Sequence, residues 1–389
     1  VFVTGAAGSV TNNAGISGYH GVGLEAGGTF TNNAGATVSG STSGVFIAGG
    51  AGTFNNAGTV TASGAAGADI EGGGSVSNAS GGSISGSSFG IFLSGGAGTV
   101  TNNGSISSVN SFGIDLTGGG SVTNGAGASI SGPGIGVAVY GGSGTVTNSG
   151  TISGGFNAVR FANSGANRLV VNPTAVFNGA VVGASGAASN TLELAGGTGS
   201  IAASSAGYGT VTANGNSWSF SNFGTVAVDT GGNWTLNGGN VATVVDNGTI
   251  GVTGSVNISG AIDPASAGLF QLNSGATLAV AAALGTNSQM TFQTGSELVI
   301  DNPSVFGINI GSTAYAGPLL EGFAAGDTID VEQFGAAGVA PQLDSTTGLL
   351  QLSNSAQQTA SLQFQTASLG SGTFHATSDG ATGIVVTLS

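Results

Sequence analysis

The stretch GTVTNNG, residues 98–104, is the clearest of seven copies of one phrase in the first half of the sequence. Each copy places one large apolar residue at a fixed position, and successive positions are 20, 24, 22, 24, 22 and 24 residues apart: Val10, Phe30, Phe54, Val76, Val100, Val122 and Val146. A mean period of about 22.7 residues falls in the range of solenoid repeats. Each copy is a short β-prone run that ends in Asn and Gly, as a strand does before a turn.

Two further sets of apolar residues follow each copy. The second set lies six or eight residues later: Ile16, Val38, Val60, Ile84, Ile106, Ile130 and Ile152. The third set is a pair of residues two apart, which face the same side of a strand: Val22/Leu24, Val45/Ile47, Ala68/Ile70, Ile91/Leu93, Ile114/Leu116, Val137/Val139 and Val159/Phe161. Three short strands per coil of about 22–23 residues predict an all-β fold, a right-handed parallel β-helix. At that period the 389 residues would give about 17 coils.

An Asn recurs two residues after the first apolar position of each coil. It has the same parity as the core residue, so we expect its amide at a corner of the coil, directed inward or along the axis. Stacked amides one coil apart form hydrogen-bonded ladders. We therefore predict a structural ladder rather than a ligand site for Asn12, Asn32, Asn56, Asn78, Asn102, Asn124 and Asn148.

Composition divides the chain into three segments. Residues 1–165 are regular, Asn/Gly-rich repeats, and Val1 and Val3 fit the third apolar set one coil before Val22 and Leu24. Residues 166–312 are predicted to be a less regular β-helix with larger core residues. One core column is predicted to run Val226/Val228, Ile250/Val252, Phe270/Leu272, Met290/Phe292 and Ile308/Ile310, and a second Trp234/Leu236, Val256/Ile258, Leu278/Val280 and Leu298/Ile300. Residues 313–389 are acidic and are expected to form closing coils or a small β cap.

The charge balance excludes several classes of partner. Lys is absent, Arg occurs only at Arg160 and Arg168, and the formal net charge is −14. Nucleic acid and anionic lipid both require a basic surface, so we expect neither as a ligand. No apolar run approaches the roughly 18 residues of a membrane span. We expect no membrane insertion by this chain.

Few residues offer catalytic or metal chemistry. A polysaccharide-degrading β-helix enzyme would need facing carboxylates, and the regular repeats supply Glu25, Asp69, Glu71 and Asp115, of which Asp69 and Asp115 lie two coils apart. They occupy an outward column on a flat face, so we expect no catalytic residues and no enzyme. His20 and His375 are far apart, and no Cys accompanies them. Calcium is the one conceivable cofactor, through Asp327, Asp330 and Glu332.

Two outward surfaces suggest other functions. Beside each first apolar residue stand two outward side chains, from Ser9/Thr11 to Thr145/Thr147, which predict a flat lattice of hydroxyls compatible with ice binding. Along the third strands the outward column contains Phe2, Phe46 and Phe92. Exposed Phe is unexpected on a solvated face, so either local loops cover these rings or they contact another chain or a ligand. With Val1 and Val3, these three residues are our candidates for self-assembly.

The repeat GTVTNSGTISG (144–154) resembles the β-helical passenger regions of autotransporters and related proteobacterial surface adhesins. The segments NRLVVNP (167–173), Phe177-Asn178-Gly179 and GFAAGDTID (322–330) resemble recurring phrases of the same group. The resemblance implies an extracellular or cell-surface β-helix that serves adhesion or coat structure. It departs in one respect, because autotransporters end in an outer-membrane barrel and no such strand series is seen in this sequence.

From these features we expect a non-enzymatic extracellular structural protein. The first hypothesis is a surface fibre subunit or adhesin stalk that assembles with itself, head to tail, through end-to-end stacking of β-solenoids. The alternative is a monomeric secreted adhesin that binds host or matrix glycans. Ice binding and polysaccharide degradation are the two minor alternatives.

Overall fold

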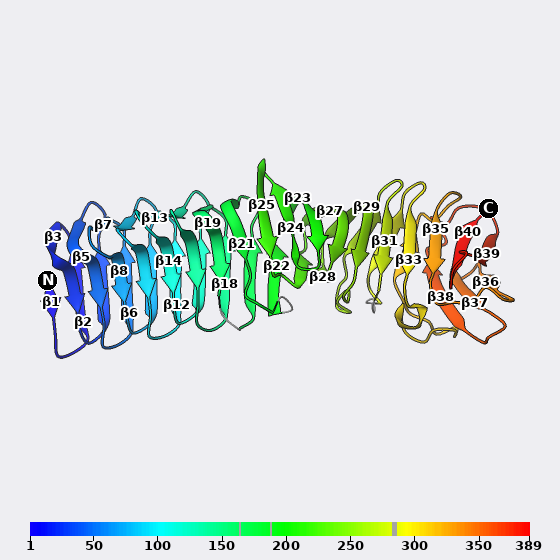
Figure 1. Ribbon diagram of the computed structural model, residues 1–389, viewed down its shortest axis with the longest axis horizontal. Helices are drawn as coiled ribbons and strands as arrows, with labels where there is room; N and C mark the ends of the chain where they lie inside the picture. Colours follow the sequence, from blue (N-terminus) through cyan, green and yellow to red (C-terminus); the bar gives the residue numbers. More distant parts are fainter. Residues whose placement is uncertain (163–164, 187–188, 282–285) are drawn as a thin grey trace. The chain divides into compact units, whose positions relative to one another are not determined.

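A computed structural model of the chain describes residues 1–162, 165–186, 189–281 and 286–389. It is a β-solenoid of about 13 turns in which 59% of residues lie in strands (Figure 1). The predicted all-β parallel β-helix is confirmed. The chain divides into two compact units, which we call the N-terminal unit (Val1–Leu192 and Asn214–Phe223) and the C-terminal unit (Glu193–Ala213 and Gly224–Ser389).

In the N-terminal unit the first strands of successive coils form one parallel sheet. Their registers place Val76, Val100 and Val122 directly above one another, as the repeat predicts. All three side chains are at most 1% exposed. The strands are β2 (Gly8–Asn12), β4 (Gly28–Asn32), β6 (Gly52–Asn56), β9 (Gly74–Asn78), β12 (Gly98–Asn102), β15 (Gly120–Asn124), β18 (Gly144–Asn148) and β20 (Asn167–Val171), with β22 (Asn190–Leu194) at the boundary between the units.

The second and third strands of each coil form the other parallel sheet of this unit, and in several coils they join into one bent strand. Both predicted apolar sets line its inner side in register, for example Ile84 beside Ile106 and Leu93 beside Leu116. The strands are β1 (Phe2–Val3), β3 (Gly15–Leu24), β5 (Thr37–Ile47), β7 (Thr59–Ala62), β8 (Ala66–Ile70), β10 (Ser83–Gly86), β11 (Phe89–Leu93), β13 (Ser105–Ser108), β14 (Phe112–Leu116), β16 (Ser129–Gly132), β17 (Ile135–Val139), β19 (Thr151–Phe161), β21 (Val176–Val182) and β25 (Asn216–Ser221).

The bend between the second and third strands requires glycine. A Cβ on Gly90 would lie 2.7 Å from Cγ2 of Ile106 and 2.6 Å from the carbonyl oxygen of Gly113, both in the next coil. The same contact recurs at Gly44, whose Cβ would lie 2.5 Å from Cγ1 of Val60. A side chain at these positions would collide with the core residue of the following coil, so these glycines keep adjacent coils at strand spacing.

Alternate coils differ in the turn that follows the first strand. After Asn102 the turn is short, and the Asn102 side chain bonds Gly104, two residues on. After Asn78 and Asn124 it is two residues longer, and the side chain bonds the carbonyl four residues on. Short and long turns alternate along the sequence with the 22- and 24-residue steps. The structural repeat of this unit is therefore a pair of coils, 46 residues long.

The C-terminal unit keeps parallel stacking but changes its strands. Here Trp234 pairs with Ile250 and Val226 with Val244, so our placement of Trp234 and Val226 in the two core columns was wrong. The columns from Ile250 through Phe270 to Met290 and from Val256 through Leu278 to Leu298 are confirmed. The strands are β23 (Gly197–Ser205), β24 (Tyr208–Ala213), β26 (Thr225–Val228), β27 (Gly232–Val241), β28 (Thr243–Asp246), β29 (Thr249–Ile258), β30 (Leu269–Leu272), β31 (Thr277–Val280), β32 (Gln289–Phe292), β33 (Glu297–Ile300), β34 (Leu319–Glu321) and β35 (Thr328–Val331).

Ile308 was also misplaced. It is 56% exposed, because the chain leaves the coil through a 3₁₀ turn (Pro303–Val305) and returns at Leu320, which takes the core position beside Met290. Among the described residues, the coils from β30 to β35 have no first strand, because the first-strand sheet ends at β28. Loops, hairpins and the cap take up the residues that we had assigned to four further coils.

Residues 340–388 form antiparallel hairpins, within the segment 313–389 for which we expected closing coils or a β cap. Antiparallel hairpins replace the parallel coils: β36 (Ala340–Asp344) pairs with β37 (Leu349–Ser353), which pairs with β38 (Thr359–Phe364), and β39 (Phe374–Ser378) pairs with β40 (Ile384–Leu388). Strand β40 also pairs antiparallel with β35 and so occupies the edge of the last parallel strand. In the described part of the chain, no helical segment is long and apolar enough to cross a bilayer.

Candidate functional site

The predicted Asn ladder is present in full. Each amide donates from Nδ2 to Oδ1 of the Asn in the next coil, at 2.8–2.9 Å, from Asn12 to Asn148. The side chains are at most 5% exposed. Each amide group thus forms hydrogen bonds with the amide groups of the neighbouring coils. The ladder is therefore part of the scaffold rather than a ligand site.

The sequence missed a second amide pair. Asn167 begins a strand, accepts the backbone N–H of Gly144 at 2.9 Å, and donates to Asn190 at 2.8 Å. Both side chains are buried. Their 23-residue spacing was available in the sequence, but their place at the start of the strand has no counterpart in the earlier coils.

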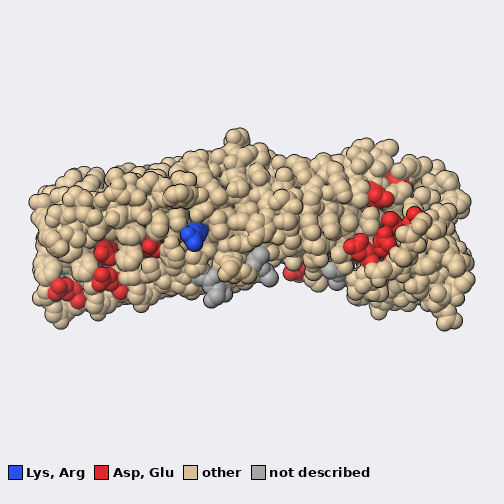
Figure 2. All heavy atoms as spheres, viewed as in Figure 1, with Lys and Arg blue, Asp and Glu red and all other residues tan. Residues whose placement is uncertain are grey.

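One outward surface of the N-terminal unit, which we call the third-strand face, carries the chemistry that the repeats otherwise lack. All charged side chains of residues 1–162 belong to it: Glu25, Asp69, Glu71, Asp115 and Arg160. Figure 2 shows few acidic or basic side chains over the rest of the visible surface of this unit. Over residues 1–162 the first-strand sheet, by contrast, has Ser, Thr and Asn as its outward residues, and the exposed Arg168 follows on β20.

The third-strand face is organised in three columns by the parallel register. The outer columns are His20, Ser43, Ala66, Phe89, Phe112, Ile135 and Asn157 on one side, and Glu25, Ala48, Glu71, Ser94, Thr117, Tyr140 and Ala162 on the other. The central column is Gly23, Phe46, Asp69, Phe92, Asp115, Ala138, Arg160 and Val182.

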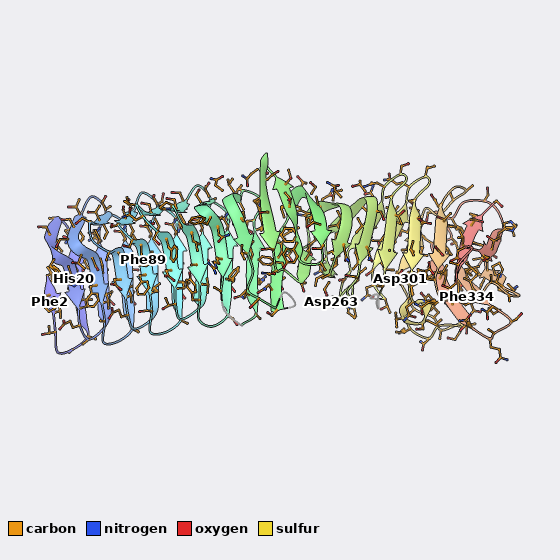
Figure 3. The ribbon with its side chains drawn as sticks, viewed as in Figure 1. Phe2, His20, Phe89, Asp263, Asp301 and Phe334 are labelled. Atoms are coloured by element: carbon orange, nitrogen blue, oxygen red, sulfur yellow. The ribbon has the colours of Figure 1, made fainter. Side chains whose placement is uncertain are left out.

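The Phe rings of this face are only partly covered. His20 stacks on Phe46 with ring centroids 4.7 Å apart, and Phe89 packs on Phe92 at 5.1 Å. Phe46, Phe92 and Phe89 remain half-buried, and the ring of Phe2 is 60% exposed (Figure 3). Local side chains therefore cover part of the predicted apolar column and leave the rest open to solvent.

Two carboxyl groups of the face are held in apolar surroundings. Asp115 is 5% exposed and its Oδ1 has no hydrogen-bond partner. Burial raises the pKa of Asp115 to about 6. For Asp69, burial and the nearby Glu71 raise the pKa to about 6. Phe92 lies between Asp69 and Asp115 in the central column, so the two carboxyls do not flank an open cleft.

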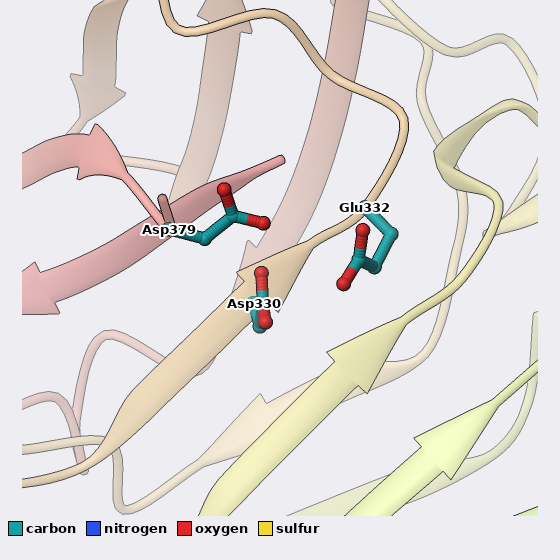
Figure 4. Close-up of side chains that lie close together, drawn as sticks. All are labelled: Asp330, Glu332 and Asp379. Atoms are coloured by element: carbon teal, nitrogen blue, oxygen red, sulfur yellow. The ribbon is translucent and has the colours of Figure 1, made fainter. Parts of the chain in front are cut away.

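The C-terminal unit has an acidic cluster that the sequence located in part. Ligand atoms of Asp330, Glu332 and Asp379 lie within 4.8 Å of one another (Figure 4). Burial and the charges of Glu332, Asp379, Glu297 and Asp301 raise the pKa of Asp330 to about 6.

Asp327, which we had grouped with Asp330 and Glu332, lies outside this cluster. It is 2% exposed and accepts backbone N–H groups from Gly295, Ser296 and Ala324. Asp327 therefore caps turns, while Asp379 is the third member that the sequence missed because it lies on the distant β39–β40 hairpin. Calcium binding by the cluster stays a prediction, which calorimetric titration with Ca²⁺ tests.

A buried carboxyl at Asp246 also escaped the sequence analysis. It ends β28, is fully buried, and its Oδ1 accepts the N–H of Gly248 at 3.0 Å, as Asn102 does with Gly104. Its Oδ2 has no partner, and burial raises the pKa of Asp246 to about 6. This carboxyl thus takes the local geometry of a ladder amide without its second hydrogen-bonding group.

Comparison with known protein families and with curated proteins finds no match for this chain. The functional argument therefore rests on the structure.

Proposed function

We propose that this chain is a non-enzymatic extracellular structural protein, a stalk or fibre element of a cell surface. The observation that carries the proposal is the pair of repeated devices in the N-terminal unit, the in-register core and the continuous amide ladder. Both are independent of the number of coils, because each coil contacts only its neighbours. Such a scaffold sets a length and presents side chains at fixed intervals.

The absence of a catalytic role is part of the proposal. Hydrolysis of a glycosidic bond needs two carboxyl groups on either side of the bond. Asp69 and Asp115 are separated by two strand spacings, roughly 9–10 Å, but Asp115 is almost fully buried and Phe92 lies between them. These contacts favour a packed surface over a substrate cleft.

The two-coil repeat gives a direct test of a length-setting function. Deletion of residues 77–122 removes one 46-residue pair of coils and joins Val76 to Thr123. The turn that then follows this strand, after Asn124, has the same length as the deleted turn after Asn78. We expect this variant to fold, to be about 10 Å shorter, and to remain at the cell surface. Deletion of residues 101–122 places two long-turn coils together and serves as the mismatched control. A scaffold role is refuted if the 46-residue deletion abolishes function without loss of folding or surface display.

Location is tested separately. Gold-labelled antibody against the purified protein should decorate the exterior of intact producing cells. Label found only after the cells are opened would contradict the extracellular assignment while leaving the fold unaffected.

The mode of assembly has two versions. End-to-end stacking would extend the parallel strands from one copy to the next, whereas β40 already covers the edge of β35 in an antiparallel pairing. That contact favours an individual stalk or glycan-binding adhesin over a filament propagated through the C-terminal hairpins. Electron microscopy of the purified chain distinguishes them, since long uniform fibres would support stacking and separate particles the stalk.

One observation favours a second function, ice binding. The outward side chains of the first strands are in register across six strand pairs and are hydroxyls except at Asn55, for example Thr99 with Ser121 and Thr101 with Thr123. Their spacing is about 4.8 Å along the stack and about 7 Å across it. Thermal hysteresis in a solution of the protein, lost on replacing Thr101 by Tyr, would establish this function over the structural one.

A further inference from the structure

We propose that two copies of this chain associate laterally and antiparallel through the third-strand face, with a two-fold axis at the level of Asp115. This contact goes beyond the proposed function, because it uses the side of the solenoid rather than its ends. It assigns a partner, a second copy of the chain, to the partly open apolar and charged surface described above.

The argument starts from the order of residues in the central column. It runs Phe46, Asp69, Phe92, Asp115, Ala138, Arg160, Val182, with one residue per strand. Read in reverse from the same centre, the column places Ala138 opposite Phe92, Arg160 opposite Asp69 and Val182 opposite Phe46. Val182 thus meets Phe46, and the one basic residue, Arg160, meets an acidic one. Ala138 is buried within its own chain, and Asp115, which is 5% exposed, lies at the axis opposite its own copy, so these two residues add little contact.

A two-fold axis produces this reversal. When the axis lies in the contact plane and perpendicular to the stacking direction, the second copy runs antiparallel and each column faces itself in reverse order. Such a contact is isologous and closes after two copies, so it does not propagate into a fibre. The symmetry yields two Arg160–Asp69 pairs, one on each side of the axis.

The first outer column fits the same axis. Reversed about the coil of Asp115, it places Phe112 opposite its own copy and Phe89 over the position of Ile135, which is itself only 4% exposed. Phe89 and Phe112 are half-buried within one chain, with their rings 5.8 Å apart. In the other outer column, Glu71 comes opposite Ala162 and so lies beside the Arg160 of the second copy. Two adjacent carboxylates, Asp69 and Glu71, therefore face each guanidinium.

The area of the contact limits how tightly the two copies associate. From Phe46 to Val182 the face spans six strand spacings, about 29 Å, and its three columns are about 17 Å wide. Part of this face is already buried within one chain, at Asp115, Ala138 and Ile135, so the two copies would together bury at most about 1,000 Å², the lower limit for specific protein association. We therefore expect a weak dimer that forms at micromolar concentrations of protein and dissociates in high salt.

Charge reversal tests the contact. Sedimentation velocity of the full chain, at low salt and tens of micromolar protein, should show dimers. Arg160→Asp faces Asp69 of the second copy with a like charge, and Asp69→Arg does the same to Arg160, so each variant alone should be monomeric. An equimolar mixture of the two variants restores both opposite-charge pairs and should dimerise again. Within one chain the two positions are four strand spacings apart, about 19 Å, so rescue in the mixture requires contact between chains.

Controls separate this contact from other causes. Phe156→Ser alters a ring that is 79% exposed but lies outside the three columns, and it should leave dimerisation unchanged. Circular dichroism and the melting temperature show whether each variant is folded. A monomeric wild type at the highest concentration, dimers of the single variants, or no rescue in the mixture would each overturn the proposal. Oligomers of increasing size that persist in all three variants would point to end-to-end contacts instead.

Discussion

Replacement of Asn102 by Ala tests whether the amide ladder stabilises the solenoid. Asn102 is fully buried in the middle of the ladder. Its Nδ2 donates to Oδ1 of Asn124 at 2.9 Å and to the carbonyl of Ser129 at 3.0 Å, and its Oδ1 accepts the N–H of Gly104 at 3.2 Å. Its Nδ2 also donates to the carbonyl of Gly104 at 3.2 Å, so the alanine variant leaves four groups without that partner, of which Oδ1 of Asn124 is buried and the others are part-buried.

The size of the effect follows from those four groups. A buried polar group deprived of its partner costs about 1–3 kcal/mol, and the low end applies where the group keeps another hydrogen bond. Asn78 retains bonds to the carbonyls of Gly82 and Ser105, so its loss is small. We therefore expect Asn102→Ala to lower the free energy of unfolding by about 3–5 kcal/mol.

The assay compares neighbouring positions in the same turn. Asn103 is exposed, so Asn103→Ala should change the free energy of unfolding by less than about 0.5 kcal/mol. Urea unfolding measures both variants, and hydrogen exchange should show faster exchange at the N–H of Gly104 in Asn102→Ala alone. Equal destabilisation by the two substitutions, or unchanged exchange at Gly104, would refute the argument that the ladder carries this stability.

Three further outcomes are expected from contacts described above. Asp246→Asn should stabilise the protein above pH 6 by up to about 3 kcal/mol. Protonation of the buried carboxyl stabilises the folded state of the wild type, and this contribution is lost as pH rises through a pKa of about 6. Melting temperatures at pH 5 and pH 8 measure the effect, and an equal pH dependence in wild type and variant would contradict it. Gly90→Ala should lower stability by about 1–3 kcal/mol through overpacking against Ile106, whereas Gly142→Ala, whose Cβ would have its nearest atom at 3.8 Å, should not; thermal melts of the two variants decide. Asp330→Asn should raise the melting temperature at pH 8 more than at pH 4, because it removes a carboxylate whose ionisation burial and four neighbouring acids oppose; a larger gain at pH 4 would show that these charges do not act on the folded state.

Sequence periodicity was sufficient for the N-terminal unit. There each coil repeats the same three apolar sets, so the register of Val100 or Ile106 follows from counting residues, and the amide ladder follows from parity. Beyond β28, the described coils of the C-terminal unit lack the first strand and gain loops. Trp234 and Ile308 were misplaced because a β-prone pair looks the same whichever column it joins, and only the length of the intervening loop decides between columns.

The candidate sites were predictable to a smaller extent. Parity showed that Phe46 and Phe92 point outward, but their partial cover by His20 and Phe89 depends on the bend before each third strand. Asp379 reaches Asp330 through an antiparallel hairpin that has no repeat to count. Asp246 was missed because the regular repeats, in which an Asn takes this position, end before it.

The division of labour within a coil explains where function is to be sought. Core residues and ladder amides must match the coils above and below, so any variation there costs stability. Outward side chains are free of this constraint, yet the first-strand sheet still repeats Ser and Thr, which favour strands in any case. Among the coils of residues 1–162, the third-strand face varies most from coil to coil, with Asp69, Phe92, Asp115 and Arg160 in successive or nearby strands. A non-repeating series on a repeating scaffold specifies one register for whatever binds it, which a uniform face does not.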